Sequence, residues 1–284
     1  MRILVTGGAG FVGRHLVQSL VDSGHRVISM DKVGTKDEDK IEKVEYIISH
    51  TKNISSLNIK CDIVYHLGEY ARISTSFEDV EEVWESNVQG TYEVVNFCRK
   101  NKVKLIYAAS SSKFGNNGED ENLSPYAWTK AKNVELIKNY SSWFGVDYSI
   151  AYFYNVYGQG HANNGKYATV IGIFENQYRQ GKPLTVVLPG TQRRYFTHVT
   201  DVVRGLVSMI DKGNGCEFSF GDENSLYSVE EVARMFSKNI VFLKSLQGDR
   251  SGSPLDINNS CQILGWKPSI NLKEYILEYK NAQR

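Results

Sequence analysis

Cysteine is scarce in this chain, and neither sign of charge is in excess. Its 284 residues include four cysteines, far apart and without a CxxC pair, which argues against a disulfide framework or a structural zinc and is typical of a reducing cytoplasm. Lysine and arginine number 33 against 32 aspartates and glutamates, a formal charge of +1. Such a balance creates no overall field toward nucleic acid or an anionic membrane. We therefore expect no nucleic-acid partner and no bound metal.

Long hydrophobic runs are also missing. No segment approaches the roughly 18 to 20 apolar residues of a membrane span. The first residues, Met1-Arg2-Ile3-Leu4-Val5, lead directly into a glycine turn, which leaves no room for a signal peptide. We expect a soluble protein of the cytoplasm without membrane contact.

Apolar runs alternate with longer amphipathic stretches over the first half of the chain. Runs that are apolar throughout indicate strands covered on both faces, which means a parallel sheet with helices on each side. Helices are expected at 11–22, 80–100 and 126–144, and the order predicts a doubly wound α/β fold. The expected strands contain Ile3-Leu4-Val5, Val27-Ile28, Ile63-Val64-Tyr65, Leu105-Ile106-Tyr107 and Tyr148-Ser149-Ile150.

The alternation loosens after about residue 155, where glycines and prolines punctuate the chain. A strand-like segment at 194–199, an apolar helix at 201–210, a strand at 218–220 and a helix near 229–237 follow. We expect one large domain over 1–156, with returning elements at about 194–222, and a smaller interleaved lobe over 157–284.

A glycine-rich turn follows the first strand and opens the first helix. Gly7 and Gly10 would let the backbone turn tightly and approach a pyrophosphate, while the helix N-terminus offers free N–H groups. Gly13 would let the helix pack on its strand, and Asp31 closes the second strand as the acidic residue that accepts from ribose hydroxyls. These features predict a Rossmann domain that binds NAD in preference to NADP, although Lys32 and Lys36 nearby weaken that preference.

A tyrosine and a lysine stand one helical turn apart at the start of a later helix. Ser124 is expected as the N-cap and Pro125 as the first helical residue. Tyr126 and Lys130 then share one face, so the ammonium favours the phenolate. Because a free tyrosine titrates near about 10, a tyrosine base at neutral pH needs such help. The pair predicts an acid–base site beside the cofactor.

With these motifs, the sequence resembles the extended short-chain dehydrogenase/reductases that act on nucleotide sugars. The resemblance runs over most of the sequence and implies an NAD-dependent enzyme with a smaller C-terminal substrate-binding lobe. The motifs that carry it are Thr6-Gly7-Gly8-Ala9-Gly10-Phe11-Val12-Gly13, 62–67, Asn87-Val88-Gln89-Gly90-Thr91, Ala109-Ser110-Ser111-Ser112, Tyr126 with Lys130, Asn155-Val156-Tyr157-Gly158, 194–201 and Leu264-Gly265-Trp266-Lys267-Pro268.

Residue roles carry over position by position. The family's catalytic Ser or Thr lies five residues before a glycine that is Gly115 here, so Ser110 joins Tyr126 and Lys130 as the implied catalytic set. Its hydroxyl would bond the substrate oxygen that the tyrosine deprotonates. The implied substrate-binding residues are Ser111, Ser112, Asn155, Arg194 and Arg250, and the two arginines would clamp the diphosphate. The implied cofactor-binding residues are Gly7, Gly10, Phe11, Val12, Gly13, Asp31, Lys32, Leu67, Tyr126 and Lys130.

Some positions depart from the family pattern. Subfamilies that eliminate water carry an Asp-Glu pair where this chain has Ser111 and Ser112, and serine cannot act as acid or base near neutral pH. A 4,6-dehydratase is therefore disfavoured. His50 stands where an Asp usually meets the adenine amine, and Phe114 and Tyr195 replace a Tyr and an Asp.

The expected function is that of an NAD-dependent sugar-nucleotide 4-epimerase or 4-oxidoreductase that passes through a 4-keto intermediate. The alternatives are a heptose-type epimerase with a second base in the loop of His161, Asn164 and Lys166, a keto-sugar reductase, or an NAD-binding regulator on the same fold. The apolar faces of 80–100 and 126–144 are expected to pair across a two-fold axis in a homodimer.

Overall fold

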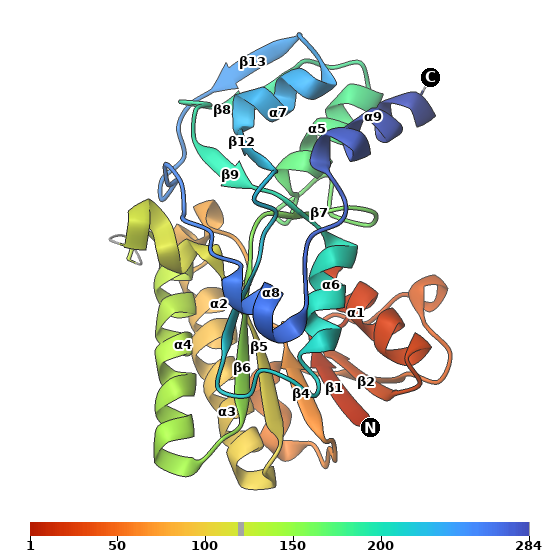
Figure 1. The fold of residues 1–284 in the computed structure, drawn as a ribbon, viewed down its shortest axis with the longest axis vertical. Coiled ribbons are helices and arrows are strands. Elements are labelled where there is room, and N and C mark those ends of the chain that lie inside the picture. The colour runs from red at the N-terminus through yellow and green to blue at the C-terminus, as the bar shows by residue number, and fades with distance from the viewer. Residues whose placement is uncertain (119–121, 284) are drawn as a thin grey trace.

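The computed structural model describes residues 1–118 and 122–283, and it shows a twisted parallel sheet that carries a smaller lobe at one end (Figure 1). The seven strands lie in the order β11-β6-β5-β4-β1-β2-β3, and every neighbouring pair is parallel. The order reverses between β1 and β4, where a doubly wound sheet opens a crevice for a ligand. The strands of this sheet are β1 (Arg2–Thr6), β2 (Arg26–Asp31), β3 (Glu45–Ile48), β4 (Ile63–His66), β5 (Lys104–Ser110), β6 (Tyr148–Phe153) and β11 (Glu217–Phe220).

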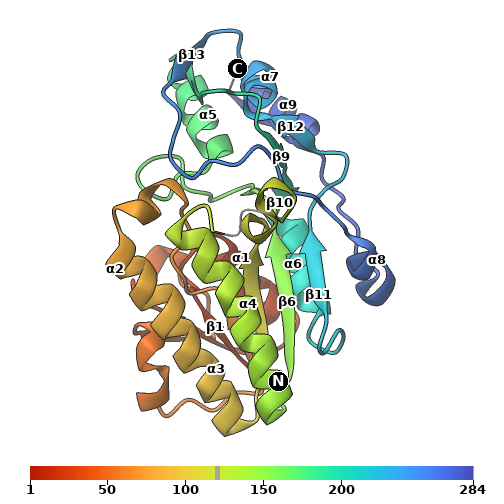
Figure 2. The same ribbon diagram turned by 90° about the vertical axis from the view of Figure 1, so that its left-hand side faces the viewer.

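Helices cover both faces of the sheet, as the apolar runs predict. On one face α1 (Phe11–Asp22) and α6 (Val199–Ser208) pack their apolar sides against the central strands, and α8 (Asn258–Leu264) extends this cluster. On the other face α3 (Gly90–Asn101) and α4 (Pro125–Phe144) form a second buried cluster with the sheet. Figure 2 shows α3 and α4 side by side in front of the strands. The fold class expected from the sequence is confirmed.

The helix expected at 80–100 forms in three consecutive pieces. A short helix α2 (Val80–Val83) runs into a π-helical segment (Trp84–Gln89), which continues as α3. The backbone at the junctions stays in the right-handed helical region, so the rod is continuous with a local widening. Such widenings are frequent at functional sites.

The smaller lobe has its own apolar cluster, built by α5 (Val170–Arg179), β8 (Leu184–Val187), α7 (Val229–Phe236) and α9 (Leu272–Ala282). The segment expected as one strand at 194–199 is divided into β9 and β10. The remaining strands are β7 (Val156–Tyr157), β9 (Arg193–Tyr195), β10 (Thr197–His198), β12 (Leu226–Ser228) and β13 (Ile240–Leu243), and short 3-10 helices lie at Asp37–Asp39, Thr51–Ser56, Ser74–Phe77 and Ser111–Gly118.

The chain crosses between the two parts more than once. After β7 it enters the lobe with α5 and β8, and it returns to the sheet with α6 and β11 before the lobe is completed. The lobe stands over the carboxyl ends of the sheet strands (Figure 1). No helix within 1–118 or 122–283 combines the length and the apolar character that crossing a membrane requires.

Candidate active site

A cleft of about 980 Å³ lies at the carboxyl edge of the sheet and takes side chains from both the sheet and the lobe. Ser112 is the one predicted site residue that is absent from its lining. The predicted residues that line the cleft are Gly7, Gly10, Phe11, Val12, Gly13, Asp31, Lys32, Leu67, Ser110, Ser111, Tyr126, Lys130, Asn155, Arg194 and Arg250. Segments far apart in sequence therefore meet at one place.

The glycine turn has space for backbone only. Gly7 adopts φ of +72°, and a Cβ there would stand 2.7 Å from the carbonyl carbon of Leu67. A Cβ on Gly13 would lie 2.0 Å from the carbonyl oxygen of Gly7. Helix α1 begins after Gly10 with no side-chain cap on its first N–H groups, which leaves these donors for an anion. The turn therefore fits the pyrophosphate of a dinucleotide.

Asp31 lies at the carboxyl end of β2, where a ribose of such a ligand would sit. Its two carboxylate oxygens accept from the backbone N–H groups of Ala9 (3.2 Å) and Val33 (3.1 Å), which fixes the carboxylate and leaves lone pairs for hydroxyl groups. Lys32 pairs with Glu82 at 2.6 Å. This pairing draws the lysine away from a role in attracting a 2′-phosphate.

The residues expected to carry out the chemistry lie together in the cleft. Ser124 caps α4 by accepting from the N–H of Ala127 at 3.1 Å, and this capped start places Tyr126 and Lys130 on the first turns of the helix. Tyr126 is 9% exposed and Lys130 is 5% exposed. Ser110 lies at the end of β5. A tyrosine beside a lysine and a serine hydroxyl can accept a proton from a substrate alcohol.

Two arginines from the second half of the chain differ in how many of their N–H donors already have a hydrogen-bond partner. Arg194 donates to Asp249 Oδ1 at 2.6 Å and to the carbonyl of Arg250 at 2.6 Å. Arg250 is 7% exposed and donates through Nη2 to Ser111 Oγ at 2.9 Å, while its Nε and Nη1 have no partner among the described residues. Burial lowers the pKa of Arg250 to about 10, so it stays cationic at neutral pH. Two buried and unpaired donors on a cation fit a phosphate.

The two serines after β5 form hydrogen bonds with other predicted site residues. Ser112 is buried, and its backbone N–H and its hydroxyl both donate to Ser110 Oγ, at 3.2 and 2.9 Å. Ser111 accepts from Arg250. No carboxylate stands at either position, so the chain lacks an acid–base pair at the place where the dehydratases of the resembled family carry one.

Two departures from the family pattern find local partners. His50 accepts from the N–H of Lys52 at 3.2 Å through Nδ1, and its Nε2 lies 3.3 Å from Ser86 Oγ. Burial lowers the pKa of His50, so the ring is neutral at pH 7. Tyr195 packs edge-on against Tyr154, and its carbonyl accepts from the side chain of Asn155 at 2.9 Å.

The loop after β7 offers no free base. His161 is buried and lies 2.8 Å from Glu175 Oε2. Lys166 forms ion pairs at 2.8 Å with both Asp79 and Glu82, and its hydrogen bonds to these carboxylates raise its pKa. A lysine held as an ammonium cannot accept a proton, so the loop lacks a ready second base. No cluster of His, Cys and carboxylates that could hold a metal exists in residues 1–118 and 122–283.

Sequence reasoning did not single out Glu69, Arg72 and Asp249, which all line the cleft. Glu69 forms an ion pair with Lys130, and its side chain is 1% exposed. Arg72 donates to the carbonyl of Tyr167, and its buried Nε has no partner in the described part of the chain. A signal was present for Glu69, because a charged residue three positions after a buried strand is placed at the ligand-binding edge of a parallel sheet.

Comparison with known proteins gives one consistent result. The profile of the NAD-dependent epimerase/dehydratase family matches residues 3–219. A Methanocaldococcus jannaschii protein that bears the provisional name UDP-glucose 4-epimerase is 30% identical over 98% of this chain and 97% of its own. A UDP-N-acetyl-alpha-D-glucosaminuronate decarboxylase of Bacillus cytotoxicus is 32% identical over 82% of this chain and 78% of its own.

A solved structure shows the same similarity in three dimensions. The Bacillus cereus UDP-glucuronic acid 4-epimerase, crystallised with UDP-glucuronic acid and NAD, superposes with a TM-score of 0.87 at 26% identity. The match covers 100% of this chain and 99% of the other. The similarity therefore includes the smaller lobe as well as the sheet.

Proposed function

The chain belongs to the NAD-dependent epimerase/dehydratase family, and on this basis we propose that it is a 4-epimerase or 4-oxidoreductase of a nucleotide-diphosphate sugar. It oxidises the C4 hydroxyl to a 4-keto sugar, which is then reduced on its other face or leaves as product. The 4-epimerase similar to it over the whole chain supports this assignment. NAD is the cofactor, and the glycine turn and Asp31 are the residues that would hold it.

One observation carries the proposal: Tyr126, Lys130 and Ser110 share a cleft with the glycine turn and with the unpaired donors of Arg250. This arrangement supports a base that shares one cleft with a site for a dinucleotide and a site for a second phosphate-bearing ligand. A binding protein would need the two anion sites but not the tyrosine and lysine. The alternative of an NAD-binding regulator is therefore disfavoured.

The mechanism assigns one task to each of the chain's own groups. Arg250 holds the diphosphate and so sets the depth at which the sugar enters. The hydroxyl of Ser110, fixed by Ser112, orients the C4 oxygen, and Tyr126 takes its proton with electrostatic help from Lys130. NAD supplies the hydride acceptor and afterwards the hydride donor. For epimerisation the 4-keto sugar has to turn within the cleft, and the same tyrosine then returns its proton.

A panel of nucleotide sugars tests this function directly. The purified protein is incubated with NAD and with UDP-, GDP- or ADP-sugars, and product identity is followed together with the absorbance of reduced cofactor. We expect a C4 epimer or a 4-keto product from at least one substrate. A 4-keto-6-deoxy product, formed by loss of water across C5 and C6, would contradict the proposal. The absence of turnover on any nucleotide sugar would contradict it as well.

A uronic-acid substrate is a second candidate, in which oxidation at C4 is followed by epimerisation or by loss of the C6 carboxylate. The observation in its favour is Arg72, a cation in the cleft with a buried donor that has no described partner. A guanidinium suits a carboxylate. Including UDP-glucuronate in the panel and measuring released carbon dioxide separates decarboxylation from epimerisation.

We also propose that the protein is a cytoplasmic homodimer. Large apolar side chains along the face of the π-helical segment, α3 and α4 are about half exposed, namely Trp84, Tyr92, Trp143 and Phe144. They support a homodimer through this face. The four cysteines are free thiols, in keeping with a cytoplasmic location. We also propose the division into an NAD-binding domain over 1–156, with returning elements at about 194–222, and a substrate-binding lobe over 157–284.

A further inference from the structure

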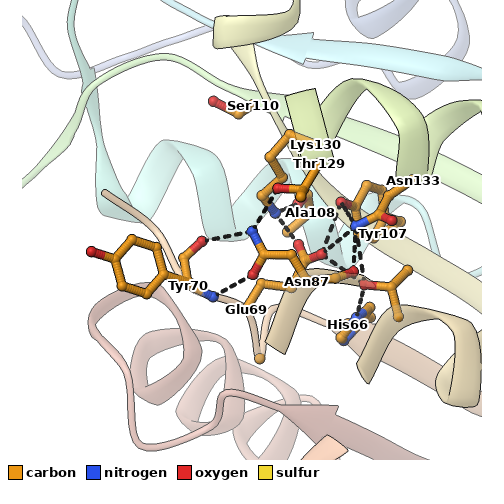
Figure 3. A network of polar contacts seen from close by, with 12 residues as sticks. His66, Glu69, Tyr70, Asn87, Tyr107, Ala108, Ser110, Thr129, Lys130 and Asn133 are labelled. Carbon is orange, nitrogen blue, oxygen red and sulfur yellow. Dashed lines mark hydrogen bonds and ion pairs between the residues drawn. The ribbon is translucent and has the colours of Figure 1, made fainter. Parts of the chain in front are cut away.

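A buried carboxylate lies next to the lysine that supports the tyrosine base. Glu69 follows β4 at the carboxyl edge of the sheet, and its Oε2 pairs with Lys130 Nζ. Its Oε1 accepts from Thr91 Oγ1 at 2.7 Å, from Asn133 Nδ2 at 2.7 Å and from Tyr107 OH at 3.1 Å. Four donors around one carboxylate hold it in a fixed orientation. Figure 3 shows Glu69 within this network.

The same network determines where the lysine ammonium lies. Lys130 Nζ donates to Glu69 and, at 2.7 Å, to the carbonyl oxygen of Ala108. An ammonium has three N–H donors, so one remains for a ligand in the cleft. Neither member of the pair is more than 6% exposed, and water therefore screens their charges little.

The other ionisable groups of this region can be assigned one by one. Burial raises the pKa of Tyr107 far above its ordinary value, and burial lowers that of His66 to about 4, so both are neutral. Arg72 and Arg250 are cations that also face Tyr126. Asp249, a second carboxylate in the lining, is already paired with Arg194. Glu69 is therefore the anion in direct contact with the lysine of the catalytic pair.

We propose that Glu69 is a positioning residue for this pair: its carboxylate anchors the Lys130 ammonium and offsets its charge, so that Tyr126 becomes an active base at higher pH than beside an unpaired lysine. The inference rests on the proposed roles of the tyrosine and lysine. A positive charge beside a phenol favours the phenolate, and a carboxylate beside that charge opposes the effect. At an effective dielectric of about 20, one unit charge about 10 Å from a titrating group moves its titration by about one pH unit.

The test replaces the charge and keeps the shape. Glu69→Gln keeps the shape of the side chain and one of its two acceptor oxygens while it removes the negative charge. The first readout is the near-ultraviolet absorbance of tyrosinate against pH in NAD-loaded protein, taken as the difference between each protein and its Tyr126→Phe version. The second is the acid limb of kcat/KM on a substrate found in the panel. We expect both to move to lower pH by about one unit in Glu69→Gln.

Two further variants keep the result specific. Glu217 pairs with Lys138 and accepts from Tyr152 OH outside the cleft, so Glu217→Gln removes a similar carboxylate and should leave both profiles in place. Glu69→Asp keeps the charge and should stay within a few tenths of a pH unit of the native profile. It also serves if Glu69→Gln does not fold, because a shift in Glu69→Asp as large as that expected for the glutamine would overturn the inference.

An unchanged titration in folded Glu69→Gln, or a shift to higher pH, would also overturn the inference. The second result would mean that the carboxylate mainly keeps the lysine protonated. The absorbance titration needs no substrate. Failure of the proposed function, seen as no turnover of any nucleotide sugar, is thereby distinguishable from failure of this inference.

Discussion

At the scale of single residues, the site combines groups that are held in place with groups that are left unpaired. Ser110 is fixed by Ser112, and Lys130 is fixed by Glu69 and Ala108. Arg250 instead keeps two buried donors without a described partner. Leaving a buried donor unpaired is costly unless a ligand completes it. The fixed groups suit catalysis, and the unpaired ones suit binding.

Replacing the tyrosine tests the catalytic assignment. Tyr126→Phe should lower kcat by about 10² to 10⁴-fold, the usual contribution of a positioned acid–base group. Affinity for NAD and nucleotide sugar, measured by calorimetric titration, should change little because the ring is kept. Near-native turnover in this variant would exclude Tyr126 as the base.

Replacing the buried arginine tests the diphosphate site. Arg250→Ala should raise KM for the nucleotide sugar by about ten- to a hundredfold, since it removes charge-assisted hydrogen bonds to the ligand. NAD affinity should stay within a few-fold of native, because the glycine turn is untouched. Arg250→Lys should recover only part of the loss, as an ammonium lacks the planar fork. Steady-state kinetics would contradict the assignment if KM stayed constant.

At the scale of elements, the contact between β1 and α1 builds the proposed cofactor site. The strand ends at Thr6, and the turn after it has no space for a side chain at Gly7. The helix that follows presents uncapped N–H groups. Gly7 also donates to the carbonyl of Met30 at 2.8 Å, which ties the turn to the neighbouring strand β2. The geometry of the anion site therefore depends on how closely the helix packs on the sheet.

A single methyl group tests this packing. Gly13→Ala places a Cβ 2.0 Å from the backbone oxygen of Gly7, so the helix has to move. We expect a loss of about 1 to 3 kcal/mol in the free energy of unfolding and weaker NAD binding. Gly252→Ala is the control, because its Cβ would meet nothing closer than 3.9 Å. Equal stability of the two variants in urea unfolding would disprove the close packing.

At the scale of the whole molecule, two core clusters on the sheet and one in the lobe are connected by a chain that crosses between them. The cleft lies where these parts meet. A site shared by two parts can adjust its width by small relative movements, which agrees with a sugar that has to turn during epimerisation.

Dimerisation is tested on the exposed apolar face. Light scattering at micromolar concentration should give twice the mass of the chain. Trp84→Glu should shift the mass toward the monomer, because two buried like charges would meet near a two-fold axis. Leu277→Glu is the control, an exposed apolar residue on α9 away from this face. A monomeric native protein would refute the proposed dimer.

Acid sensitivity follows from the buried histidine of the Glu69 network. His66 is fully buried, and burial lowers its pKa to about 4, below the unfolded value of about 6.5. The unfolded state therefore binds a proton that the folded state does not bind. The free energy of unfolding falls as the pH drops from about 6.5 to 4. Between pH 6.5 and 5 the loss from this group is about 2 kcal/mol.

Urea unfolding at pH 7 and pH 5 measures this loss. His66→Gln removes the titrating group and should show a smaller difference in unfolding free energy between the two values of pH. His25→Gln is the control, since this histidine lies in the connection between α1 and β2, outside the Glu69 network. An equal pH dependence in native protein and His66→Gln would contradict the assignment.

The sequence alone determined the features that depend on near neighbours in the chain. Apolar runs predicted five of the central strands, and the capped start of α4 placed Tyr126 and Lys130 one turn apart, since helical and strand periods are local properties. The glycine turn was equally local. Strand β3 was not predicted, although Tyr46-Ile47-Ile48 is a short apolar run; its residues are only partly buried or exposed at the edge of the sheet.

Tertiary structure alone decided the partners of these groups. Glu69 and Lys130 are 61 residues apart, and Ser111 and Arg250 are 139 apart. Periodicity carries no information on which distant segments meet, because that depends on the packing of whole elements and on side-chain fit. The ion pair of Arg194 with Asp249, the ion pairs of Lys166 and the Glu69 carboxylate beside Lys130 are therefore properties of the folded chain.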